Sequence, residues 1–235
     1  MATRFGFIYA HPDDETFLSA CLIRQLADQG QSPSLLIATR GEAGRLGTER
    51  AANKEELAAL REQEMTEAAS ILGISVVEFL GWPDGQLGHI SFDELVDGVI
   101  SFIQRHELNV IFSFAEDGGN GHPDHVAISK ATTAAVLSGK CPTVKKLYYA
   151  ASATLRSAGH VPSIRIDTES GWDVKAAALR AHASQHVAIA KYFGDLHTFP
   201  EERRYEAFVL GWRDGILWPS ENQASIKEGF LAEDV

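Results

Sequence analysis

The sequence predicts an α/β fold with a Rossmann-like, mostly parallel sheet flanked by helices. Short apolar runs alternate with longer segments of helical periodicity through the first 150 residues. Such runs are typical of strands covered on both faces, and their alternation with helices implies right-handed βαβ units. The chain has 235 residues, which suits one large domain. We therefore expect a single domain over 1–235, with its core in about 1–150 and its pocket completed by 151–235.

The apolar runs locate the strands. Strands are predicted at residues 4–10, 34–39, 75–80, 109–114 and 145–151, with one more near 163–166. In a doubly wound sheet of order 3-2-1-4-5, the first and fourth strands are neighbours. Ligands bind beyond the carboxyl ends of such strands, so this edge of the sheet is the expected place for a functional site.

Apolar stripes at three- and four-residue spacing predict the helices. In residues 15–29 the stripe comprises Phe17, Leu18, Cys21, Leu22 and Leu26. Gly30 is well placed to end this helix. The same spacing predicts helices at 53–72, 92–105, 124–138 and 173–183.

Composition excludes several classes of function. The net charge of -11 argues against a nucleic-acid partner, and no apolar run approaches the ~20 residues that span a bilayer. The first residues have no signal-peptide pattern, so a cytoplasmic location is expected. No dinucleotide, P-loop or GxSxG motif occurs. Cys21 and Cys141 have no ligand-type spacing, and a disulfide between them is not expected.

The segment from Ala10 to Glu15, Ala-His-Pro-Asp-Asp-Glu, carries the first chemical motif. It brings an imidazole and two carboxylates to the point where the first strand should end. His11 and Asp14 are three residues apart, so a turn can aim both at one point. Asp13 then points elsewhere, and the adjacent carboxylates can divide their roles. Taken alone, this motif is more typical of a helix-capping turn than of a metal site.

A second motif, Gly-His-Pro-Asp-His at residues 121–125, follows the fourth predicted strand. The expected strand order brings the two motifs face to face, which favours a metal site. A catalytic zinc site typically has three protein ligands and one water. The best allocation makes His11, Asp14 and His125 the ligands of Zn²⁺, with Fe²⁺ or another divalent metal as the alternative.

The remaining residues of the two motifs are left for proton transfer. Asp13 is predicted to be the general base and His122 the general acid. Asp124 is predicted to orient His122 and to favour its imidazolium form.

The motifs together resemble those of the PIG-L/LmbE-type deacetylases, which hydrolyse N-acetyl groups, often on glucosamine. The resemblance also rests on residues 39–44, 61–64, 80–85 and on Lys175 with the later His182-Ala-Ser-Gln185. It assigns metal binding to His11, Asp14 and His125, and the base and acid roles to Asp13 and His122. It further implies a Rossmann-like fold and frequent homo-oligomers.

One position departs from part of this family. Some thiol-cofactor members carry a Tyr just before the Gly-His pair, where it can help polarise the substrate carbonyl. This chain has Asn120, whose amide can donate a hydrogen bond but cannot act as a phenol.

Glu42, Arg61 and Asp84 are candidate substrate contacts together with Asn120, because a sugar needs several hydrogen-bonding partners. The alternatives are that Glu42 supports a Gly-rich turn, that Arg61 is a solvated helix residue and that Asp84 caps a turn. Arg45 and Arg50 lie in a polar loop that could form a pocket wall or lid. His182 and His186 are four apart but lack an acidic partner at zincin spacing, which favours a packing or surface role.

Three functions remain open from the sequence. The first is a metal-dependent hydrolase that removes an N-acetyl group from an N-acetylglucosamine-type sugar or related small amide. The second is an amidase for a larger thiol- or antibiotic-type conjugate. The third is a non-catalytic metal or sugar sensor, against which the free Asp13 and His122 argue. The expected partner is a small N-acetylated molecule, with no nucleic acid and no membrane, and a homo-oligomer is possible.

Overall fold

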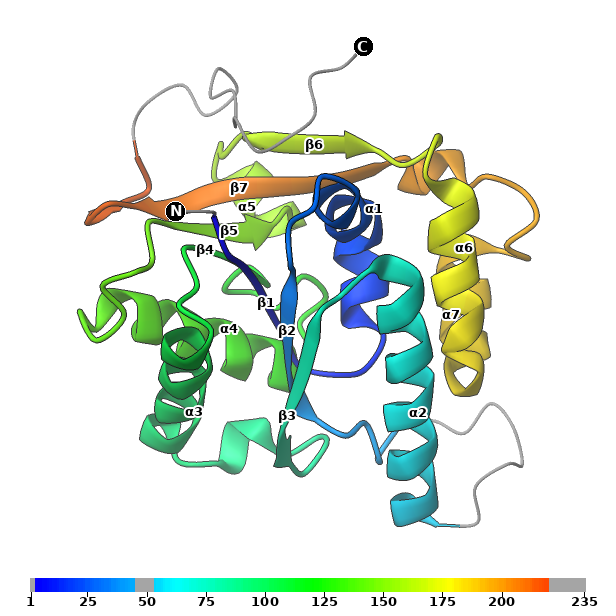
Figure 1. Ribbon diagram of the computed structural model, residues 1–235, viewed down its shortest axis with the longest axis horizontal. Helices are drawn as coiled ribbons and strands as arrows, with labels where there is room; N and C mark the ends of the chain where they lie inside the picture. Colours follow the sequence, from blue (N-terminus) through cyan, green and yellow to red (C-terminus); the bar gives the residue numbers. More distant parts are fainter. Residues whose placement is uncertain (1–2, 45–52, 220–235) are drawn as a thin grey trace.

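A computed structural model describes residues 3–44 and 53–219 of the chain (Figure 1). Its centre is a sheet of order β3-β2-β1-β4-β5-β7-β6, with β8 paired to β7. The strands are β1 Phe5–Tyr9, β2 Ser34–Thr39, β3 Val76–Trp82, β4 Val110–Ser113, β5 Lys146–Ala150, β6 Ile164–Asp167, β7 Tyr205–Arg213 and β8 Ile216–Leu217. The first five are parallel, as predicted, and the order 3-2-1-4-5 is confirmed.

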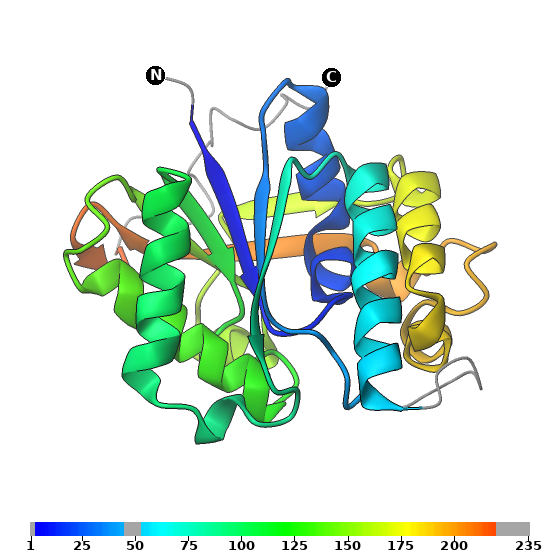
Figure 2. The same ribbon diagram turned by 60° about the horizontal axis from the view of Figure 1, so that its bottom comes forward.

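Helices cover both faces of this sheet. The helices are α1 Asp14–Asp28, α2 Lys54–Leu72, α3 Phe92–Arg105, α4 Pro123–Leu137, α5 Ala153–Ser157, α6 Trp172–Ala181 and α7 His186–Phe193. The 3-10 turns are η1 Leu87–His89, η2 Ala183–Gln185 and η3 Glu201–Arg203. Figure 2 shows α3 and α4 on one face, and α1, α2 and α6 on the other. The predicted helices are confirmed to within two residues at each end.

The last third of the described chain differs from the prediction. Residues 205–213 form one long strand, β7, which runs antiparallel to both β5 and β6. Its sequence, Tyr-Glu-Ala-Phe-Val-Leu-Gly-Trp-Arg, mixes alternation with a continuous apolar run, and residues 207–211 are buried or half-buried. Neither of the two simple strand patterns fits such a segment, so the sequence alone did not identify it.

Aromatic packing joins β1, β4 and β5 in the core. The ring of Phe112 stacks on Phe7, 4.8 Å between centroids, and on Tyr148, 5.1 Å. These residues are register partners on neighbouring strands, so the stack follows directly from the strand pairing. Phe208 of β7 meets the same ring edge-on. This stack fixes β1 and β4 side by side, and their carboxyl ends therefore share one edge of the sheet.

None of the helices in residues 3–44 and 53–219 has the length and apolar character that a bilayer crossing requires.

The aromatic stack yields a test of the core. Phe112 is fully buried, so Phe112→Ala should lower the free energy of unfolding by about 3–5 kcal/mol, because it leaves a cavity between three strands. Urea unfolding followed by circular dichroism measures the change. Phe92→Ala, at a side chain that is 49% exposed, is the matched control and should cost far less. Equal losses for the two variants would contradict this account of the core.

Candidate active site

The turn between β1 and α1 carries the first motif. The N–H of His11 donates to Asp14 Oδ2 at 2.8 Å, which folds the two predicted ligands onto each other. Both side chains are buried. Asp13, the residue between Pro12 and Asp14, has a φ of 128°, a region that a residue other than Gly seldom adopts. Its carbonyl accepts from Thr16 and Phe17, so it begins the helix and aims its carboxylate away from that of Asp14.

The second motif follows β4 through a glycine-containing loop. Gly118 has a φ of 67°, and a Cβ there would lie 2.8 Å from the Cβ of His125. Only a glycine lets the loop pass this close to His125. Pro123 opens α4, and His122 is the residue that caps it. The parallel pairing of β1 with β4 thus brings both motifs to the same edge of the sheet, as predicted.

The three predicted ligands converge on one point. His11 Nδ1 lies 3.1 Å from His125 Nε2 and 3.5 Å from Asp14 Oδ2. Asp14 Oδ1 lies 3.4 Å from His125 Nε2. Two imidazoles and a carboxylate are a typical ligand set for a catalytic zinc or another divalent metal. His11, His122 and His125 each offer a ring nitrogen within 4.8 Å of the other two, so geometry alone does not exclude His122 as a ligand.

Hydrogen bonds to the rings separate the ligands from the proton donor. His125 Nδ1 donates to the carbonyl of Gly118 at 3.1 Å, which leaves a lone pair on Nε2. His122 Nδ1 accepts from the N–H of Asp124 at 3.2 Å, so the proton of a neutral His122 sits on Nε2. His125 is therefore prepared to bind a cation, whereas His122 is prepared to donate a hydrogen bond.

The carboxylates of Asp84 and Asp124 orient the imidazole of His11. His11 Nε2 lies 3.0 Å from Asp84 Oδ1 and 3.4 Å from Asp124 Oδ2, so Nε2 donates to these carboxylates and Nδ1 faces His125 and Asp14. These three residues also form a second cluster of possible metal-binding groups. The Asp124 carboxylate further accepts from the N–H groups of Gly85 and Leu87.

The predicted contact of the Asp124 carboxylate with His122 is wrong. Asp124 is the second residue of α4, and from there its side chain turns toward the two N–H groups before η1 and toward His11. It serves His122 only through its backbone N–H. The Asp124 carboxylate therefore contacts the predicted ligand His11 and not the predicted acid His122.

The electrostatics of the cluster follow from these contacts. Burial lowers the pKa of His11, but its hydrogen bonds with Asp124, Asp14 and Asp84 outweigh burial and raise it well above the usual value. Burial raises the pKa of Asp14, yet His125 and His11 hold it far below its ordinary range. Burial lowers the pKa of His125, which favours its neutral, ligating form. The lowered pKa keeps Asp14 in the anionic form that its predicted role as a ligand requires.

Asp13 has a different environment. Arg61 Nη2 donates to Asp13 Oδ2 at 3.1 Å and to the carbonyl of Pro12, while Nη1 donates to the carbonyl of Gly41 at 2.9 Å. Burial raises the pKa of Asp13 to about 7 against the opposing effect of Arg61. A carboxylate with this proton affinity suits a general base.

The four residues predicted to contact the substrate make different contacts in the structure. Arg61 is 3% exposed, so the solvated-residue alternative is wrong, and its contacts are to the Asp13 turn. Asp84 supports His11, and Glu42 accepts from the N–H of Asp84 at 2.8 Å. Asn120 accepts from the N–H of His122 at 2.9 Å. Arg61, Asp84 and Asn120 line the pocket, and Glu42 supports its wall.

The pocket has a volume of about 900 Å³ and extends from the ligands to the last third of the chain. Its floor is the cluster of both motifs, and its far wall comes from α6, α7 and β7. Aromatic rings line much of the pocket: Tyr192, Phe193 and Tyr205 in the far wall, with Phe17 of α1 and Phe114, which follows β4. The predicted lid residues Arg45 and Arg50 lie outside the described residues.

Two buried ion pairs beside the pocket were not identified from the sequence. His182 Nε2 lies 2.9 Å from Glu15 Oε1, and Lys175 Nζ donates to Glu206 Oε1 at 2.7 Å. Each joins α1 or β7 to α6 across more than 30 residues of sequence. The only signal was the Lys175-to-Gln185 motif of the family resemblance, which marks the positions without their partners.

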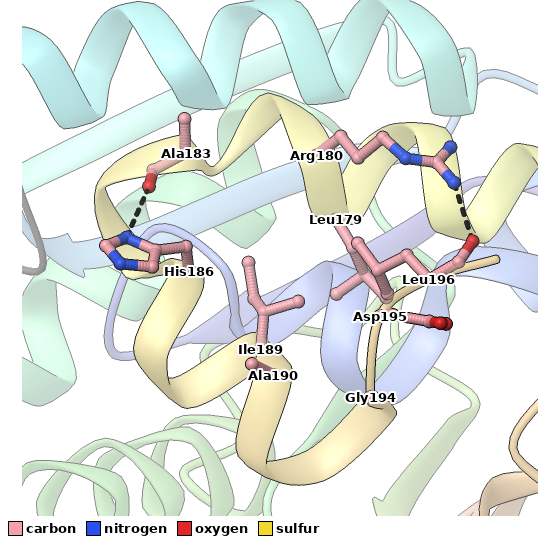
Figure 3. A pocket seen from close by; sticks show the side chains of 9 residues that line it. All are labelled: Leu179, Arg180, Ala183, His186, Ile189, Ala190, Gly194, Asp195 and Leu196. Atoms are coloured by element: carbon pink, nitrogen blue, oxygen red, sulfur yellow. Dashed lines mark hydrogen bonds between the residues drawn. The ribbon is translucent and has the colours of Figure 1, made fainter. Parts of the chain in front are cut away.

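A second, smaller pocket of about 340 Å³ lies between α6 and α7 (Figure 3). Its lining is mostly apolar. His186 Nδ1 donates there to the carbonyl of Ala183 at 3.3 Å, and Arg180 donates to the carbonyl of Leu196 at 2.6 Å. His186 is exposed and His182 is buried, so the two do not share a metal.

His11, Asp14 and His125 form a set of candidate ligands, and Asp13 is a carboxylate outside that set. This arrangement suits hydrolysis assisted by a divalent cation, and it places the protein in the class of metal-dependent hydrolases. The sequence profile of the PIG-L family, described as GlcNAc-PI de-N-acetylase, matches residues 7–136. The chain belongs to this family, and it is a deacetylase that cleaves an amide bond.

Named relatives cover most of the chain. A Bacillus cereus protein described as "Probable N-acetyl-alpha-D-glucosaminyl L-malate deacetylase 2" is 30% identical, over 87% of this chain and 91% of its own length. A "1D-myo-inositol 2-acetamido-2-deoxy-alpha-D-glucopyranoside deacetylase" of Mycobacteroides abscessus is 29% identical, over 91% and 97%. The fold matches that of an N,N'-diacetylchitobiose deacetylase from Pyrococcus horikoshii, with a TM-score of 0.72 at 20% identity, over 89% of this chain and 84% of that one.

The ligand assignment makes a direct prediction. His11→Ala should lose most of the bound metal, because it removes one of three converging donors and leaves Asp84 and Asp124 without their partner. Plasma emission analysis of the purified protein measures zinc and iron per chain. His89→Ala, at an exposed histidine, should keep the wild-type content. Full metal retention by His11→Ala would remove this residue from the ligand set.

Proposed function

We propose that the chain is a Zn²⁺-dependent deacetylase of N-acetylglucosaminyl conjugates with a small aglycone. One observation carries the proposal: the Asp13 carboxylate stands beside the His11, Asp14 and His125 set but belongs to a separate ion pair with Arg61. A structural metal site is typically closed by a fourth protein ligand, and no unligated base is needed beside it.

The donor set fits the metal. His11, Asp14 and His125 would hold Zn²⁺, and Fe²⁺ is compatible with the same nitrogen and oxygen donors. When bound, such a cation polarises the amide carbonyl and lowers the pKa of a coordinated water to about 7.

Asp13 takes the proton from the attacking water. One of its oxygens is held by Arg61, and a pKa of about 7 lets the carboxylate accept a proton and release it again near neutral pH. Arg61 also holds the carbonyl of Pro12, so the base is fixed by both its side chain and its backbone.

His122 donates a proton or a hydrogen bond to the leaving nitrogen. Its Nδ1 accepts from the N–H of Asp124, which places the transferable proton on Nε2. Asn120 is engaged through its Oδ1, so its amide nitrogen is left to bind a substrate oxygen.

The substrate assignment rests on the relatives and the pocket. Two relatives are named for N-acetylated glucosamine joined to a small polyol or hydroxy acid. The aromatic wall offers faces on which a sugar ring can pack. The volume of about 900 Å³ is near the upper end for small-molecule sites, which supports a second candidate, a larger conjugate. The cytoplasmic location and a homo-oligomer stay predictions.

Acetate release tests the substrate class. The purified Zn²⁺ protein would be incubated with N-acetylglucosamine, with its α-linked malate and inositol conjugates and with an N-acetylated glycopeptide. We expect kcat/KM to be at least about tenfold higher for one of the small conjugates than for the free sugar, since the aglycone adds contacts in the pocket. Turnover of the glycopeptide alone would favour the larger conjugate, and no acetate from any of them would overturn the proposal.

The base assignment is tested by Asp13→Asn. This change keeps the size of the side chain but removes the proton acceptor, so kcat should fall by at least about 10²-fold while zinc content stays near one per chain. Steady-state kinetics and metal analysis on the same sample measure both. Asp28→Asn, at an exposed ion pair with Arg24, is the control. Wild-type turnover by Asp13→Asn would show that another group takes the proton.

A further inference from the structure

His182 ends α6 and is fully buried, yet it is distant in sequence from both motifs. Its Nε2 lies 2.9 Å from Glu15 Oε1 and 3.3 Å from the hydroxyl of Thr16. The other oxygen of Glu15 accepts from the N–H of Asp13 at 3.1 Å. A single carboxylate therefore connects the imidazole of His182 to the backbone of Asp13.

The backbone of Asp13 needs such support. A φ of 128° in a residue other than Gly costs on the order of 1–3 kcal/mol and persists only where surrounding contacts hold it. Glu15 holds the Asp13 N–H, and Arg61 holds the Asp13 carboxylate and the carbonyl of Pro12. The Asp13 carbonyl accepts from Thr16 and Phe17, so the Glu15 contact is what holds the N–H side of the strained residue.

A second set of contacts places His182 itself. The residue two positions on, Ser184, donates to Glu64 through its N–H at 2.8 Å and through its hydroxyl at 2.6 Å. Glu64 lies three residues after Arg61 on α2, so both side chains project from one side of that helix. The contacts close into a circuit. Asp13 is bound to Arg61, which shares α2 with Glu64, and Glu64 accepts from Ser184. Ser184 follows His182, which is bound to Glu15, and Glu15 accepts from the N–H of Asp13.

The second imidazole nitrogen of His182, Nδ1, shows that the side chain is not there for its own stability. His182 Nδ1 is buried and has no hydrogen-bond partner among the described residues. An unpaired buried polar atom is destabilising, and an apolar side chain of similar volume would avoid that cost. What the imidazole adds is its contact with Glu15.

We propose that His182 is a positioning residue for the general base: through Glu15 it holds the backbone of Asp13 so that the Asp13 carboxylate faces the reacting water. This inference rests on the proposed function in taking Asp13 as the base. It gives a role to His182, which is not among the residues that line the pocket.

The first experiment compares variants at His182 by acetate release from N-acetylglucosamine. His182→Leu keeps the volume but cannot donate to Glu15, so kcat should fall about 10- to 100-fold while KM and zinc content change less than twofold. His182→Gln can still donate to Glu15, and its kcat should be at least about tenfold higher than that of His182→Leu. His186→Leu, four residues on and exposed, should keep wild-type kcat.

The second experiment reads the backbone directly and does not depend on turnover. Hydrogen exchange of the amide of Asp13, followed by NMR in the zinc-loaded protein, should be at least tenfold faster in His182→Leu. It should be unchanged in His182→Gln and His186→Leu. If the wild-type protein releases no acetate, the proposed function fails, but this exchange rate still decides the positioning role.

Glu15→Gln supplies the test if His182→Leu does not fold. His182 and the Asp13 N–H contact different oxygens of Glu15, and Gln replaces one of these oxygens with an NH2 group that cannot accept. Exchange at Asp13 should therefore again be faster, and kcat should fall. Unchanged exchange and unchanged kcat in folded His182→Leu or Glu15→Gln would overturn the proposal.

Discussion

The parallel pairing of β1 with β4 is the constraint on which the site depends. His11 follows β1 by two residues, and the loop to His125 follows β4, so the distance between the two imidazoles is set by this register. A slip by one residue would move a ligand by about 3.3 Å and reverse the face of every side chain on the strand. The stack of Phe7 on Phe112 makes that slip costly, because the two buried rings are register partners and would lose their contact. The core thus fixes the ligand geometry.

A buried site with four aspartates in an acidic protein must keep their charges apart. Asp13 is paired with Arg61, and Asp14 lies between the imidazoles of His11 and His125. Asp84 and Asp124 share the other nitrogen of His11, and each also accepts from backbone N–H groups. The partners differ in strength. Asp14, Asp84 and Asp124 have lowered pKa values in spite of burial, whereas burial prevails at Asp13 and raises its pKa. Neighbouring residues of one turn therefore differ in proton affinity, which separates a ligand from a base.

The sequence predicted what is encoded locally. The five parallel strands, the four helices between them and the convergence of the two motifs follow from periodicity, two prolines and the rule for switch points in α/β sheets. What it could not predict depends on distant partners. Asp124 is adjacent to His122 in sequence, but its carboxylate is directed by N–H groups 37 and 39 residues away. Arg61 and His182 have polar side chains with no local partner, so their burial beside Asp13 and Glu15 is visible only in the folded chain.

The last third of the described chain forms a pocket wall and also binds α1 at two successive turns. Lys175 donates to the carbonyl of Phe17, and Glu206 accepts from the N–H of Cys21, the two groups that an unbroken helix would join. One turn closer to the motif, His182 holds Glu15. The first turn of α1, which carries Asp14 and follows Asp13, is therefore fastened to α6 as well as to its own helix. This arrangement explains how the chain can sustain an unfavourable φ at Asp13, since the contacts that hold the turn come from segments already anchored in the sheet through β7.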